Sequence, residues 1–384
     1  VNAFENTTVS QCMISPDTNG NVMIPNTYKD SDLTPLAFMG CSTLKTVNYE
    51  SGSGNYLTKI WDYTFYNVKT LETVTNIPSS INSIGYAAFT KCINLITIEY
   101  NNIATSQMNS IGDNSFQYSG IKSIIIPSSV TIINTHAFDN TKSLTNITIH
   151  NYPNNGNPSK LTTINEYAFQ GSAINNITLP SSIKDLGPYC FANTYNLSTI
   201  TFGKNSIISY IPNFAFSDSA IRYITLPSSI IDIGSYTFQN CNKLKNIYYI
   251  YNGNNSNEND SQLEIISDYT FYNTGIRSIT IPVSVKEINS MSFSSCNSLF
   301  WVSISCASKV IISATAFDSS NGVTRLTLPT DVTYTGTVPV TRVAQCSLCI
   351  AGKYSASGDD GNGNCTDCPI GTYSTIIGAK FSST

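Results

Sequence analysis

Four cysteines near the end of the 384-residue chain have a spacing that is often used to hold a metal. They read Cys346-x2-Cys349 and Cys365-x2-Cys368, and fifteen residues separate the two pairs. Two such pairs of thiolates bind zinc in zinc ribbons. The segment also repeats itself, because Cys349 and Cys368 are each followed by two residues, Gly, one residue and Tyr-Ser. Spacing alone leaves a zinc site and a pair of disulfides open.

Other side chains that could do chemistry are few. The chain has only two histidines, His136 and His150, and both lie within a repeated pattern, which favours a structural role. The run Asp359 to Asn364 lacks the glycine position and the distal Glu of an EF-hand calcium loop. No glycine-rich phosphate loop precedes a helix, and there is no basic run. We predict no catalytic residue, no cofactor and no metal site, and therefore no enzyme.

The composition narrows the setting. Charged residues make up 11% of the chain, the net charge is −4 and the pI is about 5.2. This balance gives no electrostatic reason to bind nucleic acid or an anionic membrane. No stretch reaches the roughly 20 apolar residues of a membrane-spanning helix. The first residue is Val1 and no signal-peptide pattern follows it, so we expect a processed, mature chain.

Cysteines and glycosylation sequons point to an oxidising compartment. The chain has 11 cysteines, four of them in its last fifty residues. Seven Asn-x-Ser/Thr sequons are candidate glycosylation sites, namely Asn6, Asn146, Asn176, Asn196, Asn254, Asn259 and Asn364. The combination predicts an extracellular or cell-surface protein.

An internal repeat governs most of the chain. Its central pattern is an aliphatic residue, four residues of any kind, and Phe. The twelve copies are Leu33/Phe38, Ile60/Phe65, Ile84/Phe89, Ile111/Phe116, Ile133/Phe138, Ile164/Phe169, Leu186/Phe191, Ile211/Phe216, Ile233/Phe238, Ile266/Phe271, Ile288/Phe293 and Ile312/Phe317. A small residue usually follows three positions after the Phe, and then a short alternating stretch predicts a half-buried strand. Since one such turn cannot bury its own apolar face, the turns must stack, with the twelve Phe side chains in one column.

Alternate copies end their strand with proline, as in Ile126-Pro127 and Leu179-Pro180. Proline removes a backbone donor and stops the strand. The longest insertions, within 101–109, 152–159 and 252–262, follow the strand of the other copy. We therefore expect a physical unit of two turns, with its insertions along one edge.

The pattern Ile-Pro-Ser-Ser-Val-x-x-Ile-x-x-x-x-Phe resembles the BspA-like leucine-rich repeat. This resemblance covers about residues 22 to 335 and implies a right-handed, curved solenoid, found in surface or secreted proteins of adhesion and contact. The expected fold is mainly β, a leucine-rich-repeat solenoid of about twelve turns followed by a small disulfide-rich module. The predicted domains are an N-terminal segment (1–21), the solenoid (22–335) and a cysteine-rich module (336–384).

The cysteine-rich module resembles the ephrin-receptor-like and growth-factor-receptor-like modules of extracellular proteins. That resemblance implies disulfides rather than zinc. Four cysteines allow three pairings, and we predict the interlocked one, Cys346–Cys365 and Cys349–Cys368. Because such modules usually recur, we expect the natural chain to continue past Thr384.

Cysteines within the repeat have a different expectation. Cys41, Cys92, Cys241 and Cys296 occupy the small position, where Ser and Thr also occur, so we predict buried, inert thiols. Two further disulfides are possible, and the pairs are Cys12–Cys41 and Cys296–Cys306.

An aromatic run is the main candidate contact site. Tyr248, Tyr249 and Tyr251 lie beside an Asn-rich insertion, and exposed Tyr offers rigid contact area for protein or sugar. Strand packing is the alternative role of these residues.

Two functions remain in view, both without catalysis. Neither end of the array has a charged cap, so we expect a glycosylated subunit that assembles head to tail with itself into a surface or extracellular fibril. The alternative is a monomeric adhesin that binds an extracellular protein or glycan through its repeat face.

Overall fold

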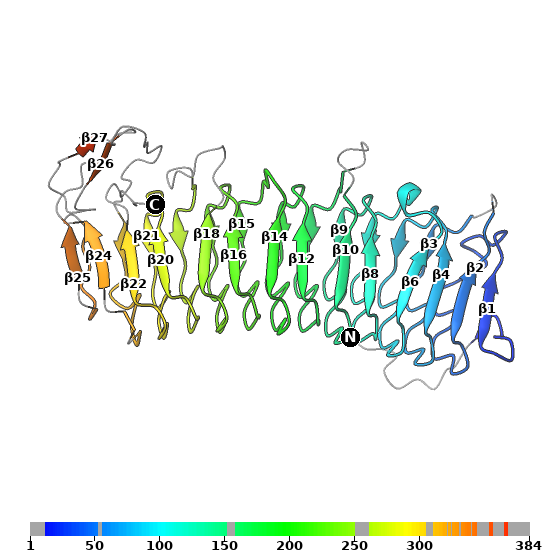
Figure 1. Cartoon of the computed structure of the whole chain (residues 1–384). Coiled ribbons are helices and arrows are strands. Elements are labelled where there is room, and N and C mark those ends of the chain that lie inside the picture. The colour runs from blue at the N-terminus through cyan, green and yellow to red at the C-terminus, as the bar shows by residue number, and fades with distance from the viewer. Residues whose placement is uncertain are drawn as a thin grey trace. The chain divides into compact units, whose positions relative to one another are not determined.

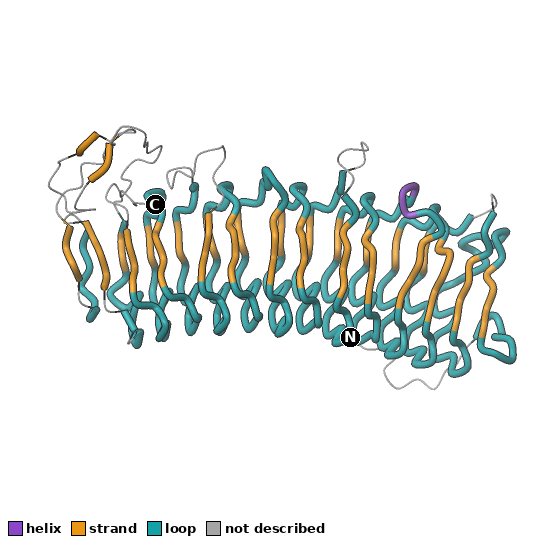
Figure 2. The backbone as a smooth tube through the Cα atoms, viewed as in Figure 1, coloured by secondary structure: helices purple, strands orange, loops and turns teal. Residues whose placement is uncertain are grey.

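The structure is a computed structural model that describes residues 12–52, 56–151, 158–249, 261–304, 310–320, 322–323, 325–329, 332–338, 340–343, 353–355 and 365–367. The chain divides into two compact units, Val1–Gly203 (unit 1) and Lys204–Thr384 (unit 2). Figures 1 and 2 show that short strands joined by turns build both units. The described residues contain no α-helix and no helix suited to crossing a membrane, only the 3-10 turn η1 (Ile103–Thr105).

Most turns of unit 1 contribute one longer outer strand and one two-residue inner strand. The outer strands are β1 (Asn21–Ile24), β2 (Thr46–Tyr49), β4 (Thr73–Ile77), β6 (Thr97–Tyr100), β8 (Ser123–Ile126), β10 (Asn146–Ile149), β12 (Asn176–Leu179) and β14 (Thr199–Phe202). The inner strands are β3 (Lys59–Ile60), β5 (Ser83–Ile84), β7 (Ser110–Ile111), β9 (Ile132–Ile133), β11 (Thr163–Ile164) and β13 (Asp185–Leu186). The inner strands pair in parallel, each with the next, into one sheet.

Unit 2 repeats this plan. Its outer strands are β16 (Tyr223–Leu226), β18 (Asn246–Tyr249), β20 (Ser278–Ile281), β22 (Trp301–Ile304), β24 (Arg325–Pro329) and β25 (Val340–Val343). Its inner strands are β15 (Tyr210–Ile211), β17 (Asp232–Ile233), β19 (Ile265–Ile266), β21 (Glu287–Ile288) and β23 (Ile311–Ile312). In the C-terminal segment, β26 (Lys353–Ser355) and β27 (Cys365–Asp367) form an antiparallel pair.

The predicted solenoid of about twelve turns is confirmed, and its core is the predicted phenylalanine column. Every Phe of the repeat is at most 1% exposed. Successive rings lie nearly parallel, with centroids 5.0–5.4 Å apart in unit 1 and 5.2–5.5 Å apart in unit 2. Full burial of one such ring contributes about 1.5–3 kcal/mol, and stacking adds about 0.5–1.5 kcal/mol.

A left-handed backbone turn surrounds each Phe of the column. The residues two before and two after it have φ between 52° and 69°, except Thr315, which is not among the positive-φ residues. Alternate N–H groups thereby point at the next turn. Around Phe138 the bonds are His136 N–H to Glu166 O at 3.1 Å, Phe138 N–H to Ala168 O at 2.7 Å and Asn140 N–H to Gln170 O at 2.7 Å. Three inter-turn hydrogen bonds offset the cost of about 1–2 kcal/mol for each left-handed residue.

The outer strands form separate groups, unlike the inner ones. In unit 1 the groups are β1-β2-β4-β6, β8-β10 and β12-β14, and in unit 2 they are β16-β18 and β20-β22-β24-β25. The sheet is thus interrupted before β8, β12 and β20. A long sequence insertion lies in each of the three connections, within 101–109, 152–159 and 252–262.

The N-terminal end of the array is covered, in contrast to the open end that the sequence suggests. The Met13 N–H donates to the carbonyl oxygen of Ala37 at 2.8 Å, as the Phe38 N–H donates to Thr64 one turn later at 2.9 Å. Residues 12 and 13 therefore take the place of a missing turn, and the disulfide Cys12–Cys41 fixes them there.

The last ring of the column in unit 2 is also covered. Tyr334 lies edge-on to Phe317, with ring centroids 6.0 Å apart. Tyr334 itself is only 9% exposed. Both terminal rings of the column are therefore sealed by polypeptide of this chain.

Candidate functional site

The outer strands present a broad surface in each unit, and in unit 1 this surface is nearly uncharged. We call the side chains at the first and third positions of the outer strands the outer face, because these positions point to solvent while the second and fourth enter the core. In unit 1 only Glu99 of the 16 positions is charged. The others are Asn21, Met23, Thr46, Asn48, Thr73, Thr75, Thr97, Ser123, Ile125, Asn146, Thr148, Asn176, Thr178, Thr199 and Thr201. This face is suited to neutral hydrogen-bonding partners.

In unit 2 the outer face carries aromatic rings. Tyr223 is 49% exposed, Tyr248 is 52% exposed, and Trp301 is half-buried. β16 pairs with β18 so that Tyr223 lies beside Asn246 and Thr225 beside Tyr248, which makes the two tyrosines diagonal neighbours. Tyr248 is thus placed where the sequence predicts a contact residue, whereas Tyr251 lies outside the described residues.

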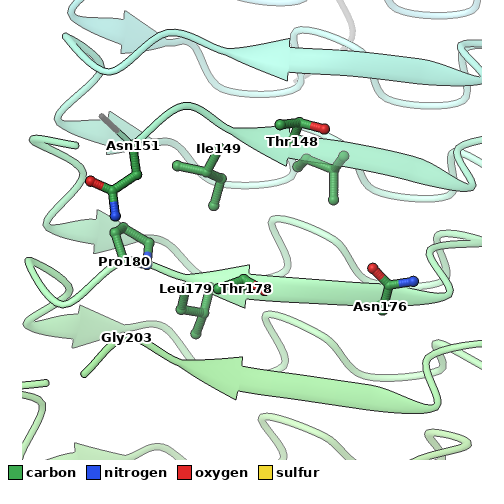
Figure 3. A pocket seen from close by; sticks show the side chains of 9 residues that line it. Thr148, Ile149, Asn151, Asn176, Thr178, Leu179, Pro180 and Gly203 are labelled. Carbon is green, nitrogen blue, oxygen red and sulfur yellow. The ribbon is translucent and has the colours of Figure 1, made fainter. Parts of the chain in front are cut away.

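A hollow opens in unit 1 where the outer sheet is interrupted between β10 and β12. We call it the slot. Its volume is about 260 Å³, and its lining residues are Ile147, Thr148, Ile149, Asn151, Asn176, Thr178, Leu179, Pro180 and Gly203. Figure 3 shows Thr148 and Ile149 on one strand facing Thr178 and Leu179 on the next, with Pro180 near Asn151 at the strand ends. No lining side chain is charged or aromatic.

Proline removes one ladder bond at this opening, although proline alone does not break the sheet, since β4, which is followed by Pro78, stays paired with β2. The residue after an outer strand normally donates to the last residue of the preceding strand, as His150 N–H does to Ile126 O at 2.9 Å. After β12 this residue is Pro180, which has no N–H to donate to Ile149. Pro127 after β8 and Pro282 after β20 stand at the other two interruptions. The lost donor and the long insertion together separate the strands.

On the side of the turns that surround the column, half-buried aromatic rings form a second ladder in part of each unit, at the position two before the column Phe. His136, Tyr167 and Tyr189 stack at 4.7 and 5.0 Å in unit 1, and Phe214, Tyr236 and Tyr269 stack at 4.7 Å in unit 2. The rings cover one another's faces, so each interior ring has no free face for a ligand to stack on. His136 Nδ1 lies 3.1 Å from the buried Asp139 Oδ2, which supports the structural role expected for this histidine.

Polar side chains at one fixed position of the repeat accept backbone hydrogen bonds from the next turn, a role that the sequence analysis did not predict. The residue three before alternate column Phe residues accepts a hydrogen bond from a backbone N–H of the next turn. The bonds are Tyr86 N to Asp62 Oδ1, Thr135 N to Asp113 Oδ1, Ser235 N to Asn213 Oδ1 and Ser290 N to Asp268 Oδ1, at 2.8–3.0 Å. Glu166 occupies the same position where the next turn offers Pro188, which has no N–H. Three carboxylates and the Asn213 amide therefore tie turns together through their side-chain oxygens.

Three of the four small-position cysteines are buried thiols, as predicted, and they hydrogen bond across turns. The prediction of a thiol is wrong for Cys41, which is buried but forms the disulfide with Cys12. The thiols of Cys92, Cys241 and Cys296 donate to the carbonyl of the preceding column Phe at 2.9–3.1 Å, as the Ser320 hydroxyl does. Burial raises the pKa of Cys241 to about 12 and that of Cys296 to about 11. A thiol that stays protonated is a poor nucleophile. Cys190, also buried, was not singled out from the sequence.

One predicted disulfide needs correction. Cys296 is a free, fully buried thiol whose sulfur points inward to the Phe271 carbonyl, so the pair Cys296–Cys306 is not formed. Cys306 lies outside the described residues, as do Cys346, Cys349 and Cys368, and Cys365 is described only by its backbone in β27. The choice between zinc and disulfides in the C-terminal module stays a prediction. The described residues contain no cluster of three or more potential metal ligands.

Three candidate glycosylation sites can be located. Asn146, Asn176 and Asn196 are exposed, and the first two start β10 and β12 at the same register. Asn6, Asn254, Asn259 and Asn364 lie outside the described residues. His150 follows β10, and burial lowers its pKa.

Known protein families match nearly the whole chain. The BspA type leucine-rich repeat region matches residues 17–145, 109–245 and 264–339, and a region described as tyrosine-protein kinase ephrin type A/B receptor-like matches residues 336–383. No curated protein matches the chain.

Two solved structures are similar to it. A leucine-rich repeat protein from Bacteroides ovatus has 24% identity and a TM-score of 0.52, covering 84% of this chain and 92% of its own. The pneumococcal vaccine antigen PcpA has 16% identity and a TM-score of 0.41, covering 87% and 100%.

Proposed function

This chain belongs to the BspA type leucine-rich repeat family, and from that premise we propose that it is an extracellular, non-catalytic scaffold that binds a partner protein through its outer face. The observation that carries the proposal is the outer face itself. It is wide and regular, and it is nearly uncharged in unit 1. In unit 2 it displays Tyr223 and Tyr248 on the paired strands β16 and β18, and Trp301 on β22, which pairs with β20.

Aromatic side chains suit this task because they offer a large contact area at a low entropic cost. The hydroxyl and amide groups around them can hydrogen bond a partner without the desolvation cost of charges. The turn side offers less, since its aromatic ladder is stacked on itself and its carboxylates cap backbone groups. The outer face is therefore the surface best suited to recognition.

An extracellular setting agrees with the disulfide Cys12–Cys41. It also agrees with the exposure of the three sequons that can be located. We propose Asn146 and Asn196 as the sites to examine first for glycans, by mass spectrometry of the secreted protein.

A fibril subunit is the second candidate, and one observation favours it. Among the described strands, β1 and β25 end their sheets with one unpartnered edge each, and such edges can pair between chains. The covered rings Phe38 and Phe317 weigh against stacking through the core. Any assembly would have to use the strand edges.

Microscopy and binding together test the proposal. Light scattering and negative-stain images of the full chain at several dilutions should show monomers, whereas regular fibres would favour the second candidate. On a panel of immobilised extracellular-matrix proteins, the variant Tyr223→Ser/Tyr248→Ser should lose binding at least tenfold. The matched control is Ile311→Ser, which removes an apolar side chain 71% exposed on inner strand β23. Equal loss in both variants would refute the outer face as the binding surface.

A further inference from the structure

We propose that the slot between β10 and β12 is an anchor site that takes one branched aliphatic side chain of the partner polypeptide. This inference rests on the proposed function, because it assigns a specific contact within the outer face. The slot lies wholly in unit 1, and all of its lining residues are described.

The floor of the slot consists of side chains that elsewhere belong to the core. The core-facing positions of β12, Ile177 and Leu179, are 2% and 0% exposed. The corresponding positions of β10, Ile147 and Ile149, are only half-buried, because no paired strand closes over them on the β12 side. Apolar area that stays in contact with water is a source of binding free energy when a ligand covers it.

The size of the slot suits one side chain. Its volume is about 260 Å³. An apolar cavity of about 150 Å³ is large enough to bind benzene. A leucine or isoleucine side chain with its flanking peptide bond is the corresponding fragment of a polypeptide.

The rim of the slot selects for a neutral peptide. Thr148, Thr178, Asn151 and Asn176 place hydroxyl and amide groups around the apolar floor. Gly203 contributes backbone, since an added Cβ there would lie 2.5 Å from the Ser181 nitrogen. These groups can hydrogen bond the peptide groups that flank the anchoring side chain. Pro180 has no N–H, so the ladder bond that the residue after an outer strand normally donates to the preceding strand cannot form with Ile149.

The lining also excludes other ligand classes. A charged group would enter a site without a counter-charge, which is unfavourable on an apolar floor. A sugar would find no aromatic ring to stack on. Taken together, the nine lining residues suit a neutral aliphatic group that is flanked by amide groups.

Methyl NMR of the full-length chain tests the inference without knowledge of the partner. Isoleucine δ1-methyl groups are labelled with carbon-13, and Ile147→Val and Ile149→Val assign the two signals. The probe is N-acetyl-leucine methylamide, compared with N-acetyl-lysine methylamide. We expect the leucine probe to shift the Ile147 and Ile149 signals with a millimolar dissociation constant, and the lysine probe to bind at least fivefold more weakly.

Variants that fill the slot with a larger side chain can be compared with a control variant on the neighbouring strand. Thr178→Phe places a ring over the slot and should weaken the leucine probe at least fivefold, whereas Thr201→Phe, at the same register of β14, should not. Thr148→Phe is the second plug if Thr178→Phe does not fold. Absent shifts, equal binding of both probes, or equal effects of Thr178→Phe and Thr201→Phe would overturn the inference. So would a glycan on Asn176 of the native protein, since it would occupy the rim.

The two tests fail separately. If Tyr223→Ser/Tyr248→Ser binds matrix proteins as well as its control does, while the leucine probe still shifts the NMR signals, the proposed function is refuted. The slot would then bind aliphatic groups without a role in partner binding. The reverse result would keep the scaffold and remove the anchor site.

Discussion

On the turn side of each unit, rings of the Phe column stack at 5.0–5.5 Å, and two or three backbone bonds beside each described ring pair link one turn to the next. On the strand side, the sheet breaks at three places and the outer face changes from threonine and asparagine in unit 1 to tyrosine and tryptophan in unit 2. The constant residues of the repeat lie on the turn side, where a change would lower stability. The residues of the strand side vary, and the slot opens there, because a change on that side costs little stability.

The strongest test of this comparison removes one ring from the column. Phe169→Ala should lower the free energy of unfolding by about 3–5 kcal/mol, because it leaves a cavity between two stacked neighbours. Urea unfolding followed by circular dichroism measures the loss. Phe169→Leu, which keeps most of the volume, should lose clearly less. A loss below 1 kcal/mol for the alanine variant would contradict a column that holds the turns together.

The N-terminal cover should contribute nearly as much. Replacing Cys12 and Cys41 by Ser removes a bridge across 29 residues, and bridges of this kind contribute about 2–4 kcal/mol. The measurement is the same urea titration, without reductant. If the cover protects the first turn, amide exchange should accelerate at Phe38 and remain unchanged at Phe169. Uniform acceleration would mean that the disulfide acts on the whole chain.

Alkaline pH should lower the free energy of unfolding, because the buried thiols ionise more readily in the unfolded chain than in the folded one. The folded pKa values of Cys241 and Cys296, about 12 and 11, exceed the value of about 8.5 for an exposed thiol. Their contribution is therefore complete below pH 8.5 and is lost as the pH rises toward 11–12. Between pH 8 and 10.5, each thiol should contribute a loss of about 2.5 kcal/mol, so wild type should lose roughly 5 kcal/mol more stability than Cys241→Ser/Cys296→Ser. Parallel pH profiles of the two proteins would contradict buried, protonated thiols.

Variants of Cys296 should show whether a small-position side chain stabilises the fold by donating a hydrogen bond or only by filling space. Cys296→Ala removes the donor to the Phe271 carbonyl and should cost about 1–3 kcal/mol, whereas Cys296→Ser keeps a donor and should cost less. Differential scanning fluorimetry of the two variants gives the order. Equal melting temperatures would mean that the sulfur only fills space.

The outer face should be the most tolerant region. Thr201→Ala changes an exposed side chain and Thr73→Ala a half-buried one, and surface changes of this kind stay within about 0.5 kcal/mol. The same urea titration applies. A loss comparable to that of Phe169→Ala would remove the contrast between the two sides.

Much of the fold follows from the sequence because its signals are local and repeated. Phe at a fixed distance from an aliphatic residue predicts the column, and alternation predicts each outer strand. Within the repeat, the burial of Cys92, Cys241 and Cys296 follows from their exchange with Ser and Thr.

The rest depends on contacts between turns. Three factors together decide whether β12 pairs with β10. They are Pro180, the insertion after β10, and the distance between the two strands that results from both. The proline is visible in the sequence, but its effect is not, since the Pro-ended β4 still pairs with β2 over three residues. The cover of the first turn was missed for a similar reason. Met13 imitates the backbone of a column Phe without resembling it in side chain.

The backbone bonds between successive turns have a mechanical consequence. They all connect one turn to its neighbour, so a force that pulls the two ends of a unit apart loads the outermost interface first. The turns should then peel off singly, each releasing 22 to 33 residues between successive Phe positions. Each step would lengthen the chain by roughly 7–12 nm. A protein that holds a partner while it is pulled could yield in small, recoverable increments and keep its remaining turns folded.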